Sequence, residues 1–138
     1  MFKVKRKINF YDCDPAGILF FAKIYEFCHS VYEEMIQSFM LEENYWSNDD
    51  YVVPIIHSEA TYHKPFSYNS FAVIELAVES ISSSAFKLAY ACKNENDELC
   101  VEVKTTHVFV DKKTWKKKKI KDDVRKNLYT HSNNENMD

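Results

Sequence analysis

Residues 10–21 read FYDCDPAGILFF, and they separate two different patterns of hydrophobicity. Before them, apolar residues at positions 2, 4, 8 and 10 alternate with polar ones, which is typical of a half-buried strand. After them, from residue 22 to about residue 41, apolar side chains recur at steps of three and four. This spacing predicts one long amphipathic helix. The residues on its apolar face are Ile24, Phe27, Cys28, Val31, Met35 and Phe39.

The remainder of the chain is dominated by segments rich in β-branched and aromatic residues. We expect strands near residues 52–63, 71–81, 85–93 and 99–110, and their short connections predict that these four form an antiparallel meander. A polar stretch at 42–50 is expected to hold a short turn of helix around Tyr45 and Trp46. A second short helix is expected around 124–128.

One element, the long helix, has the length to cover the apolar face of this sheet. The predicted fold is therefore α+β, with a five-stranded antiparallel sheet wrapped around one long helix. Residues 1–128 are expected to form a single domain, and residues 129–138 a polar, disordered tail.

Composition excludes several function classes. Gly17 is the only glycine in 138 residues, where average usage would give about ten. No GxGxxG, GxxxxGK[ST] or GxSxG motif exists, so glycine-rich phosphate loops and the hydrolase nucleophile elbow are excluded. The net charge of −3 argues against a chain-wide surface for nucleic acid. The four cysteines form no CxxC pair, so we expect free thiols in a cytoplasmic protein, and no apolar run has the length of a signal or membrane segment.

The densest chemical cluster, Asp12 to Gly17, lies where the strand pattern ends and the helix pattern begins. One interpretation is purely structural, because Asp caps helices, Pro fixes φ and Gly permits a tight bend. The other is catalytic. The first N–H groups of a helix lack partners within it and carry the positive end of its dipole. A carbonyl oxygen placed there is polarised, and a neighbouring carboxylate can attack the carbonyl carbon or activate water, which indicates an acyl-transfer site. Asp12 is expected to hydrogen-bond the loop.

The run FYDCDPAGILFF, the helix after it, and VVPIIHSEATYHKPFSYNS at 52–70 resemble the hotdog-fold thioesterases of the 4-hydroxybenzoyl-CoA thioesterase group. The resemblance spans roughly residues 4–111. Within that group, CHSVYEE at 28–34 and PIIHS at 54–58 are most similar to the 1,4-dihydroxy-2-naphthoyl-CoA hydrolases of quinone biosynthesis.

The resemblance implies an acyl-CoA thioesterase without metal or other cofactor. Asp14 would be the catalytic carboxylate, either as nucleophile or as general base. Gly17 would lie in the bend beside the thioester, and the backbone N–H of Phe21 would bind the carbonyl oxygen. An aromatic pocket formed by Phe20, Phe21 and Tyr25 would suit an aryl acyl group.

The resemblance also implies an oligomer, a homodimer that shares two sites or a homotetramer. Apolar residues on the second face of the predicted sheet agree with this, because such a face needs a cover. They are Phe71, Val73, Val101 and Phe109.

Three histidines and a serine complete the set of candidate residues. His57 and Ser58, in the middle of their strand, are expected to line the pocket; the alternative is a structural hydrogen bond in the sheet. His57 and His63 share a face with Glu59 but lie about 20 Å apart at ~3.3 Å per residue, so we predict no metal site. His29 is expected to be structural.

Residues 112–119 read KKTWKKKK and hold six lysines. They form either a solvated loop, a rim in which Lys116 and Lys117 attract the phosphates of coenzyme A, or a nucleic-acid patch. The rim would compensate for Ser82, Ser83 and Ser84, which stand where the hydroxybenzoyl enzyme has an Arg/Lys cluster. We expect no nucleic-acid or membrane partner.

The leading hypothesis is a thioesterase for an aromatic acyl-CoA of the 1,4-dihydroxy-2-naphthoyl-CoA or 4-hydroxybenzoyl-CoA type. A thioesterase for an aliphatic acyl-CoA or an acyl carrier protein is the alternative within the enzyme class. Two further hypotheses are a non-catalytic acyl-CoA binding module and a nucleic-acid adaptor that uses the lysine run.

Overall fold

The computed structural model describes residues 1–132. Five strands form one antiparallel sheet in the order β1-β4-β5-β6-β3, and a two-stranded sheet pairs β2 with β7. The strands are β1 (Phe2–Lys7), β2 (Tyr51–Val52), β3 (Ile55–Tyr62), β4 (Phe71–Ile81), β5 (Ala85–Lys93), β6 (Leu99–Val108) and β7 (Val110–Asp111). The helices are α1 (Lys23–Ser38), α2 (Asp122–Tyr129) and a short 3-10 helix at Phe10–Asp12.

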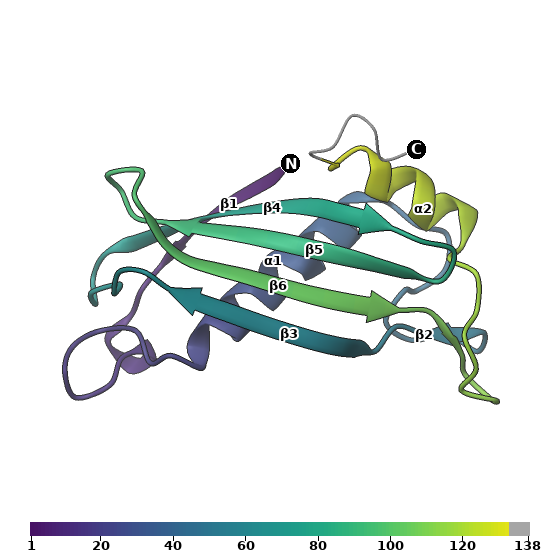
Figure 1. Cartoon of the computed structure of the whole chain (residues 1–138), viewed down its shortest axis with the longest axis horizontal. Coiled ribbons are helices and arrows are strands. Elements are labelled where there is room, and N and C mark those ends of the chain that lie inside the picture. The colour runs from purple at the N-terminus through teal and green to yellow at the C-terminus, as the bar shows by residue number, and fades with distance from the viewer. Residues whose placement is uncertain (133–138) are drawn as a thin grey trace.

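Helix α1 crosses one face of the five-stranded sheet diagonally (Figure 1). It is amphipathic as predicted, and its buried side chains pack with inward-facing residues of the strands. On β5 every second side chain is buried, which is the period of a strand with one covered face. The buried helix residues are Ile24, Cys28, Val31, Tyr32, Met35 and Ile36. The predicted α+β fold of one sheet around one long helix is confirmed. The prediction for the second face of the sheet was wrong for Val101 and Phe109, which are buried in the core. Phe71 and Val73 alternate with the buried positions of β4 and lie on the outer face as predicted.

The local boundaries differ from the prediction at several places. The first strand ends at Lys7, and Phe10, expected on the buried face, is 75% exposed. Residues 45–46 form a turn and not a helical turn. The segment expected as one strand at 52–63 is divided by Pro54, which has no N–H for a ladder, into β2 and β3. The segment at 99–110 is likewise divided into β6 and β7.

The prediction of a four-strand meander was wrong for β3. Strands β4, β5 and β6 do form a meander, but β3 pairs with β6 and not with β4, and β1 pairs with β4. The connection at 63–70 therefore runs along the end of the sheet. Its backbone bonds the loop at residues 13–22, called the Asp14 loop below, instead of closing a hairpin. Leu19 N donates to Phe66 O at 2.7 Å, and Tyr68 N donates to Gly17 O at 3.1 Å.

The carboxyl-terminal segment packs back on the sheet. Helix α2, expected near 124–128, buries Val124 and Leu128, and Arg125 donates to the carbonyls of Ser82 and Ser83. Part of the predicted disordered tail is therefore placed, because residue 129 ends α2 and Val78 N donates to His131 O at 2.9 Å. The rest of that predicted tail, 133–138, lies outside the described residues.

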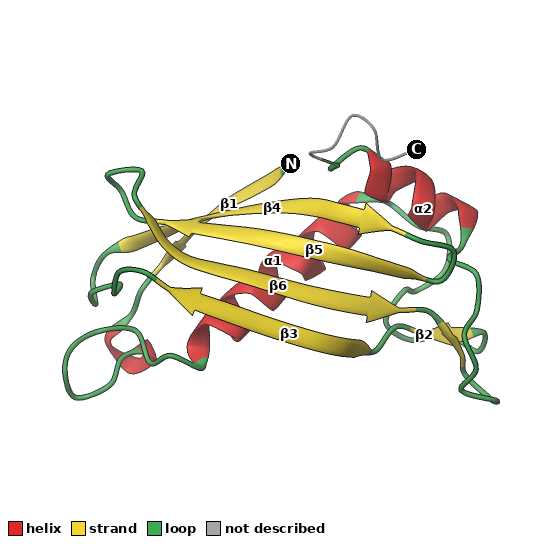
Figure 2. Ribbon diagram, in the orientation of Figure 1, coloured by secondary structure: helices red, strands yellow, loops and turns green. Residues whose placement is uncertain are grey.

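Loops gather at two opposite ends of the sheet, as Figure 2 shows. One end carries the residues before α1, and the other carries β2, β7 and the lysine-rich connection to α2. All four cysteines are free thiols, as predicted, and Cys28 and Cys92 lie in the core with their sulfur atoms 3.8 Å apart. Neither described helix is long and apolar enough to cross a membrane.

Candidate active site

The Asp14 loop is a compact turn in front of α1. Asp14 O accepts from Gly17 N at 2.9 Å, and Asp14 N donates to Ile18 O at 3.0 Å, so residues 14–18 close on themselves. The side chain takes part, because Asp14 Oδ1 accepts from Ala16 N at 2.9 Å. Among the described residues, nothing donates to the second carboxylate oxygen, Oδ2. The turn therefore holds the carboxylate in place and leaves one of its oxygens free.

Gly17 is required by backbone conformation and not by lack of space. Its φ is +79°, in the left-handed region that favours glycine. A Cβ atom at this position would meet only Tyr68 Cδ1, at 3.9 Å, which is an ordinary contact. The tight bend predicted at Gly17 is therefore present, and the space that a side chain at this position would occupy is free of close contacts.

Asp12 and Cys13 support the loop. Asp12 is buried, and its Oδ2 accepts from Asn9 N at 2.9 Å, which agrees with the hydrogen-bonding role expected for it. Burial, followed by the charges of Asp12 and Asp14, raises the pKa of the Cys13 thiol. Cys13 therefore stays a thiol at neutral pH and is poorly suited to act as a nucleophile.

The backbone before α1 presents a free donor. The helix begins at Lys23, and no side chain caps it. The N–H of Phe21, two positions earlier, donates to no described atom, whereas the carbonyl of Phe21 accepts from Tyr62 Oη on β3. Tyr62 thus fixes the peptide between Phe21 and Ala22. The preceding peptide, which carries the Phe21 N–H that the resemblance assigns to the thioester carbonyl, is fixed by its own carbonyl, because Phe20 O accepts from Lys23 N at 2.9 Å.

A hollow of about 310 Å³ brings these groups together. Asp14, Phe20 and Phe21 line it from the loop, and Tyr62 and His63 line it from the end of β3. His63 Nε2 lies 2.9 Å from Glu102 on the neighbouring strand. Asp14 has no ion-pair partner among the described residues, so its negative charge stays available to a ligand.

A second hollow, about 220 Å³, lies farther along the same helix. Tyr25 and Ser58, both predicted to contact substrate, line it, and most of its surface is apolar. The residues around it are Tyr25, Cys28, His29, Ile55, Ser58, Tyr90 and Thr105. Tyr25 is part of this hollow, separate from the one that holds Phe20 and Phe21.

A buried polar pair backs the second hollow. Thr105 Oγ1 lies 2.8 Å from His107 Nε2, and the His107 ring is fully buried, stacked on Phe86 at 4.8 Å between centroids. Burial lowers the pKa of His107 to about 3, with a smaller contribution from His29. His107 is therefore neutral at physiological pH and holds the Thr105 hydroxyl at the wall of the hollow.

His57 and Ser58 point to opposite faces of the sheet, as neighbouring strand residues must. Ser58 lines the second hollow, whereas His57 is exposed on the other face, with Nε2 3.1 Å from Glu59. Within this chain His57 does not reach the pocket predicted for it. His29 has a structural partner, as expected, since its Nδ1 is 2.8 Å from Glu33 Oε2, and it also borders the second hollow.

Lys116 and Lys117 lie at the other end of the molecule from Asp14, after β7 (Figure 1). Within one chain they do not approach the Asp14 hollow. The residues on either side of the lysine-rich segment bond the turn at 82–84, because Phe109 N donates to Ser84 O at 2.7 Å and Ile120 N to Ser83 O at 3.0 Å.

Tyr62, Tyr90 and Thr105 are site residues that the sequence did not single out. Tyr62 could have been found from the sequence, because it lies four residues after Ser58 on one predicted strand and therefore on the same face of the sheet. Thr105 could not be found in this way, because its position opposite Ser58 depends on the pairing of β3 with β6.

Comparison with known proteins agrees with this architecture. The thioesterase-like superfamily matches residues 8–128. A 1,4-dihydroxy-2-naphthoyl-CoA hydrolase of Crocosphaera subtropica is 29% identical over 111 residues, covering 78% of this chain and 81% of that protein. One from Prochlorococcus marinus is 28% identical, covering 97% and 90%.

A solved structure has the same fold. Slr0204, a 1,4-dihydroxy-2-naphthoyl-CoA thioesterase from Synechocystis, superposes with a TM-score of 0.87 at 23% identity, covering 93% of this chain and 95% of that one. The match to the thioesterase-like superfamily at residues 8–128 covers most of the sequence. It agrees with the resemblance that residues 10–21 and 52–70 indicated. This chain belongs to the thioesterase-like superfamily.

Proposed function

We propose that this thioester hydrolase acts on an aromatic acyl-CoA, with the Asp14 carboxylate and the Phe21 N–H as the groups that meet the thioester carbonyl. One observation carries the proposal: Asp14, whose carboxylate has a free oxygen, and Phe21, whose backbone N–H has no acceptor in the described chain, line the same hollow. This pair is what acyl transfer needs, a group that attacks or activates water and a donor for the oxygen that becomes negative.

The reaction has two possible first steps at this geometry. Asp14 Oδ2 attacks the carbonyl carbon and forms a mixed anhydride, which water then hydrolyses. Alternatively, Asp14 takes a proton from a water that attacks the carbon directly. In both cases the Phe21 N–H stabilises the developing oxyanion. The carbon–sulfur bond breaks, and the coenzyme A thiolate leaves and takes up a proton.

The second hollow is the place for the acyl group. Its apolar walls suit an aromatic ring, and the hydroxyls of Ser58 and Thr105 suit ring substituents that form hydrogen bonds. Relatives named 1,4-dihydroxy-2-naphthoyl-CoA hydrolase support a hydroxylated aryl group. A 4-hydroxybenzoyl group has the same chemistry and remains within the proposal.

A second copy of the chain completes the site. Strand β3 pairs on one side only, its exposed residues include Ile55, Ile56 and Tyr62, and it contains neither lysine nor proline to block pairing. Antiparallel pairing of two β3 strands about a twofold axis brings the end of one beside the start of the other. The partner's Lys116 and Lys117 then face the Asp14 hollow, where they meet the phosphates of coenzyme A.

Two such dimers joined through the outer sheet face give the homotetramer expected from the resemblance. Sedimentation equilibrium tests the assembly. A particle of two or four times 16.3 kDa is expected, and a monomer at assay concentration contradicts it.

A panel of thioesters tests the activity. Purified protein is assayed for thiol release from hydroxylated aryl-CoA, unsubstituted aryl-CoA, aliphatic acyl-CoA and acyl carrier protein substrates. The highest kcat/KM is expected with hydroxylated aryl-CoA. Faster turnover of an aliphatic or carrier-protein substrate overturns the aromatic assignment, and coenzyme A binding without thiol release from any substrate overturns the enzymatic one.

A further inference from the structure

The lysine-rich segment after β7 forms a well-ordered hairpin. Asp111 N donates to Lys116 O at 2.8 Å, and Trp115 N donates to Asp111 O at 2.8 Å. The Asp111 carboxylate accepts from the backbone N–H groups of Lys113 and Thr114, at 2.9 Å each. The hairpin therefore holds Trp115, which is 61% exposed, in a defined position.

Trp115 forms one wall of a hollow of about 300 Å³. Trp46, itself half exposed, is a second aromatic wall, and Pro54 belongs to the lining as well. The complete lining is Tyr45, Trp46, Val52, Val53, Pro54 and Trp115. A hollow with flat aromatic walls and no charged residue in its lining suits a planar, neutral ring system.

The lysines around this hollow divide into two groups. Lys118 and Lys121 contact the Asp50 carboxylate, and Lys112 Nζ donates to Asn48 O at 2.8 Å. The other side chains are exposed and have no acidic or hydrogen-bonding partner in the described part of the chain. They are Lys113, Lys116, Lys117 and Lys119. Unpaired positive charge beside an aromatic hollow is the combination that binds a base together with phosphates.

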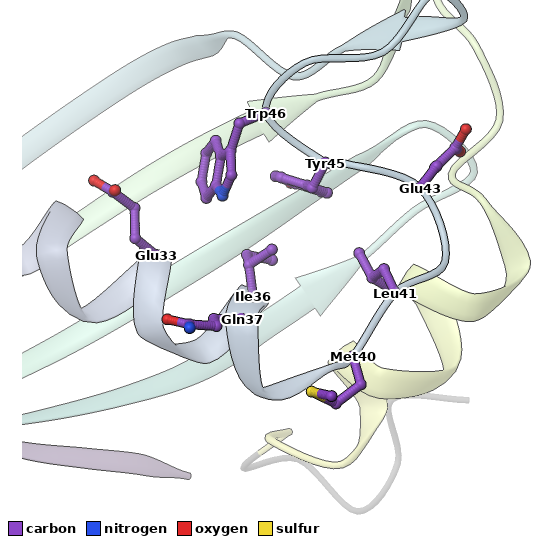
Figure 3. A pocket seen from close by; sticks show the side chains of 8 residues that line it. All are labelled: Glu33, Ile36, Gln37, Met40, Leu41, Glu43, Tyr45 and Trp46. Atoms are coloured by element: carbon purple, nitrogen blue, oxygen red, sulfur yellow. The ribbon is translucent and has the colours of Figure 1, made fainter.

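The neighbouring hollow shows the opposite charge. On the far side of Trp46, a hollow of about 460 Å³ over the end of α1 is bordered by Glu33 and Glu43 (Figure 3). Met40 lies at its lower edge in this view, and Leu41 lies at its right. Its acidic border disfavours a phosphate-bearing ligand, so charge assigns such a ligand to the Trp115 side alone.

We propose that the hollow between Trp46 and Trp115 binds the adenine of coenzyme A, while the unpaired lysines of the hairpin bind its phosphates. This inference rests on the proposed function and extends it to the nucleotide end of the substrate. Within one chain the hairpin lies beyond the far end of β3, about 26 Å long at ~3.3 Å per residue. In the β3-paired dimer, Trp115 of the partner subunit is the one that faces the Asp14 hollow.

Tryptophan fluorescence of the full chain reports on this hollow directly. In the Trp46→Phe variant, Trp115 is the remaining tryptophan. Adenosine 3′,5′-bisphosphate and coenzyme A are expected to quench it, and pantetheine, which lacks the nucleotide, is not. The variant Trp115→Ala is expected to raise the calorimetric Kd for the bisphosphate about tenfold or more, whereas Trp115→Phe keeps most of the affinity because an aromatic face remains.

Kinetics separate this proposal from the proposed activity. Trp115→Ala is expected to raise KM for acyl-CoA about tenfold at unchanged kcat, and to leave hydrolysis of the matching acyl-pantetheine unchanged. Lys116→Gln with Lys117→Gln weakens bisphosphate binding and its salt dependence, and the control Lys126→Gln on α2 does not. Because bisphosphate binding needs no turnover, it can succeed even if no thioester is hydrolysed.

Two results overturn the proposal. One is a bisphosphate Kd that is unchanged in Trp115→Ala. The other is tighter binding of a single-stranded oligonucleotide than of coenzyme A, which assigns the hairpin to nucleic acid.

Discussion

The hydroxyl of Tyr62, at the end of β3, donates to the backbone carbonyl of Phe21, just before α1. This bond joins two segments 41 residues apart and fixes the plane of the peptide between Phe21 and Ala22. The Phe21 N–H has no acceptor in the described chain, and the peptide that carries it is held at its other end, where Phe20 O accepts from Lys23 N at 2.9 Å. The peptides before and after Phe21 are therefore held by the start of α1 and by the sheet, respectively.

Removal of this bond tests its role in positioning. Tyr62→Phe keeps the ring in place but leaves the Phe21 peptide less constrained. We expect kcat to fall about three- to tenfold with little change in KM, the range of one hydrogen bond expressed in the transition state. Tyr129→Phe on α2 is the matched control. Equal kcat values for Tyr62→Phe and wild type would remove Tyr62 from the account.

Gly17 gives a prediction about backbone conformation. Because its φ is +79° and its side is open, an added methyl group costs conformational energy and little else. Gly17→Ala is expected to lower the free energy of unfolding by about 1 kcal/mol, and Gly17→Val by more, whereas Gly17→Asn lowers it less because Asn tolerates this region.

Urea denaturation measures these differences in the free energy of unfolding. The kcat/KM of the folded fraction measures whether Gly17 also matters for activity. If the thioester passes close to this turn, Gly17→Val loses more activity than its folded fraction accounts for. Normal activity in the folded fraction would reduce Gly17 to a structural turn residue.

His107 predicts a pH dependence of stability. Its pKa is lowered to about 3 in the folded chain, mainly by burial, against about 6.5 when unfolded. Between these values the unfolded chain binds a proton that the folded chain does not. Stability therefore falls as pH falls from about 6.5, by at most about 1.4 kcal/mol per pH unit from this group.

Denaturation at pH 6.5, 5.5 and 4.5 measures this slope. His107→Gln is expected to have a shallower slope than wild type. A slope for His107→Gln that equals that of wild type would contradict the neutral, buried state of His107.

Ser58 predicts substrate discrimination. Its hydroxyl borders the second hollow without a partner among the described residues, so Ser58→Ala leaves no buried group unsatisfied. We expect kcat/KM to fall about three- to tenfold for a hydroxylated aryl-CoA and to stay unchanged for the unsubstituted one. Thr105→Val is a less clean test, because it also removes the partner of His107. An equal fall for both substrates would assign Ser58 to general packing.

Patterns that are local in the sequence were sufficient for much of this structure. The switch from a period of two to a period of 3.6 at residues 10–21 located α1, and Asp14 and Gly17 lie in the turn expected there. The strands at 71–81 and 85–93 have the predicted limits. Each of these features is decided by neighbours within a few residues.

Features that depend on distant pairing were not predictable in this way. An eight-residue connection at 63–70 is compatible with a hairpin, and only its bonds to the Asp14 loop and Ile8 explain why β3 pairs with β6 instead. The same pairing places Thr105 beside Ser58. The prediction that His57 and Ser58 both line the pocket failed for a different reason. Neighbouring residues of a strand point to opposite faces of the sheet, so the sequence itself places these two side chains apart.

The kcat of Asp14→Asn shows whether Asp14 is the catalytic carboxylate. The substitution keeps the Oδ1 atom that accepts from Ala16 N, so the turn is expected to persist, but it removes the negative charge. With a hydroxylated aryl-CoA, the account predicts a fall in kcat of at least about a hundredfold with acyl-CoA binding retained, while the exposed control Asp49→Asn behaves as wild type. A kcat for Asp14→Asn within a fewfold of wild type would contradict the assignment of Asp14 as the catalytic carboxylate.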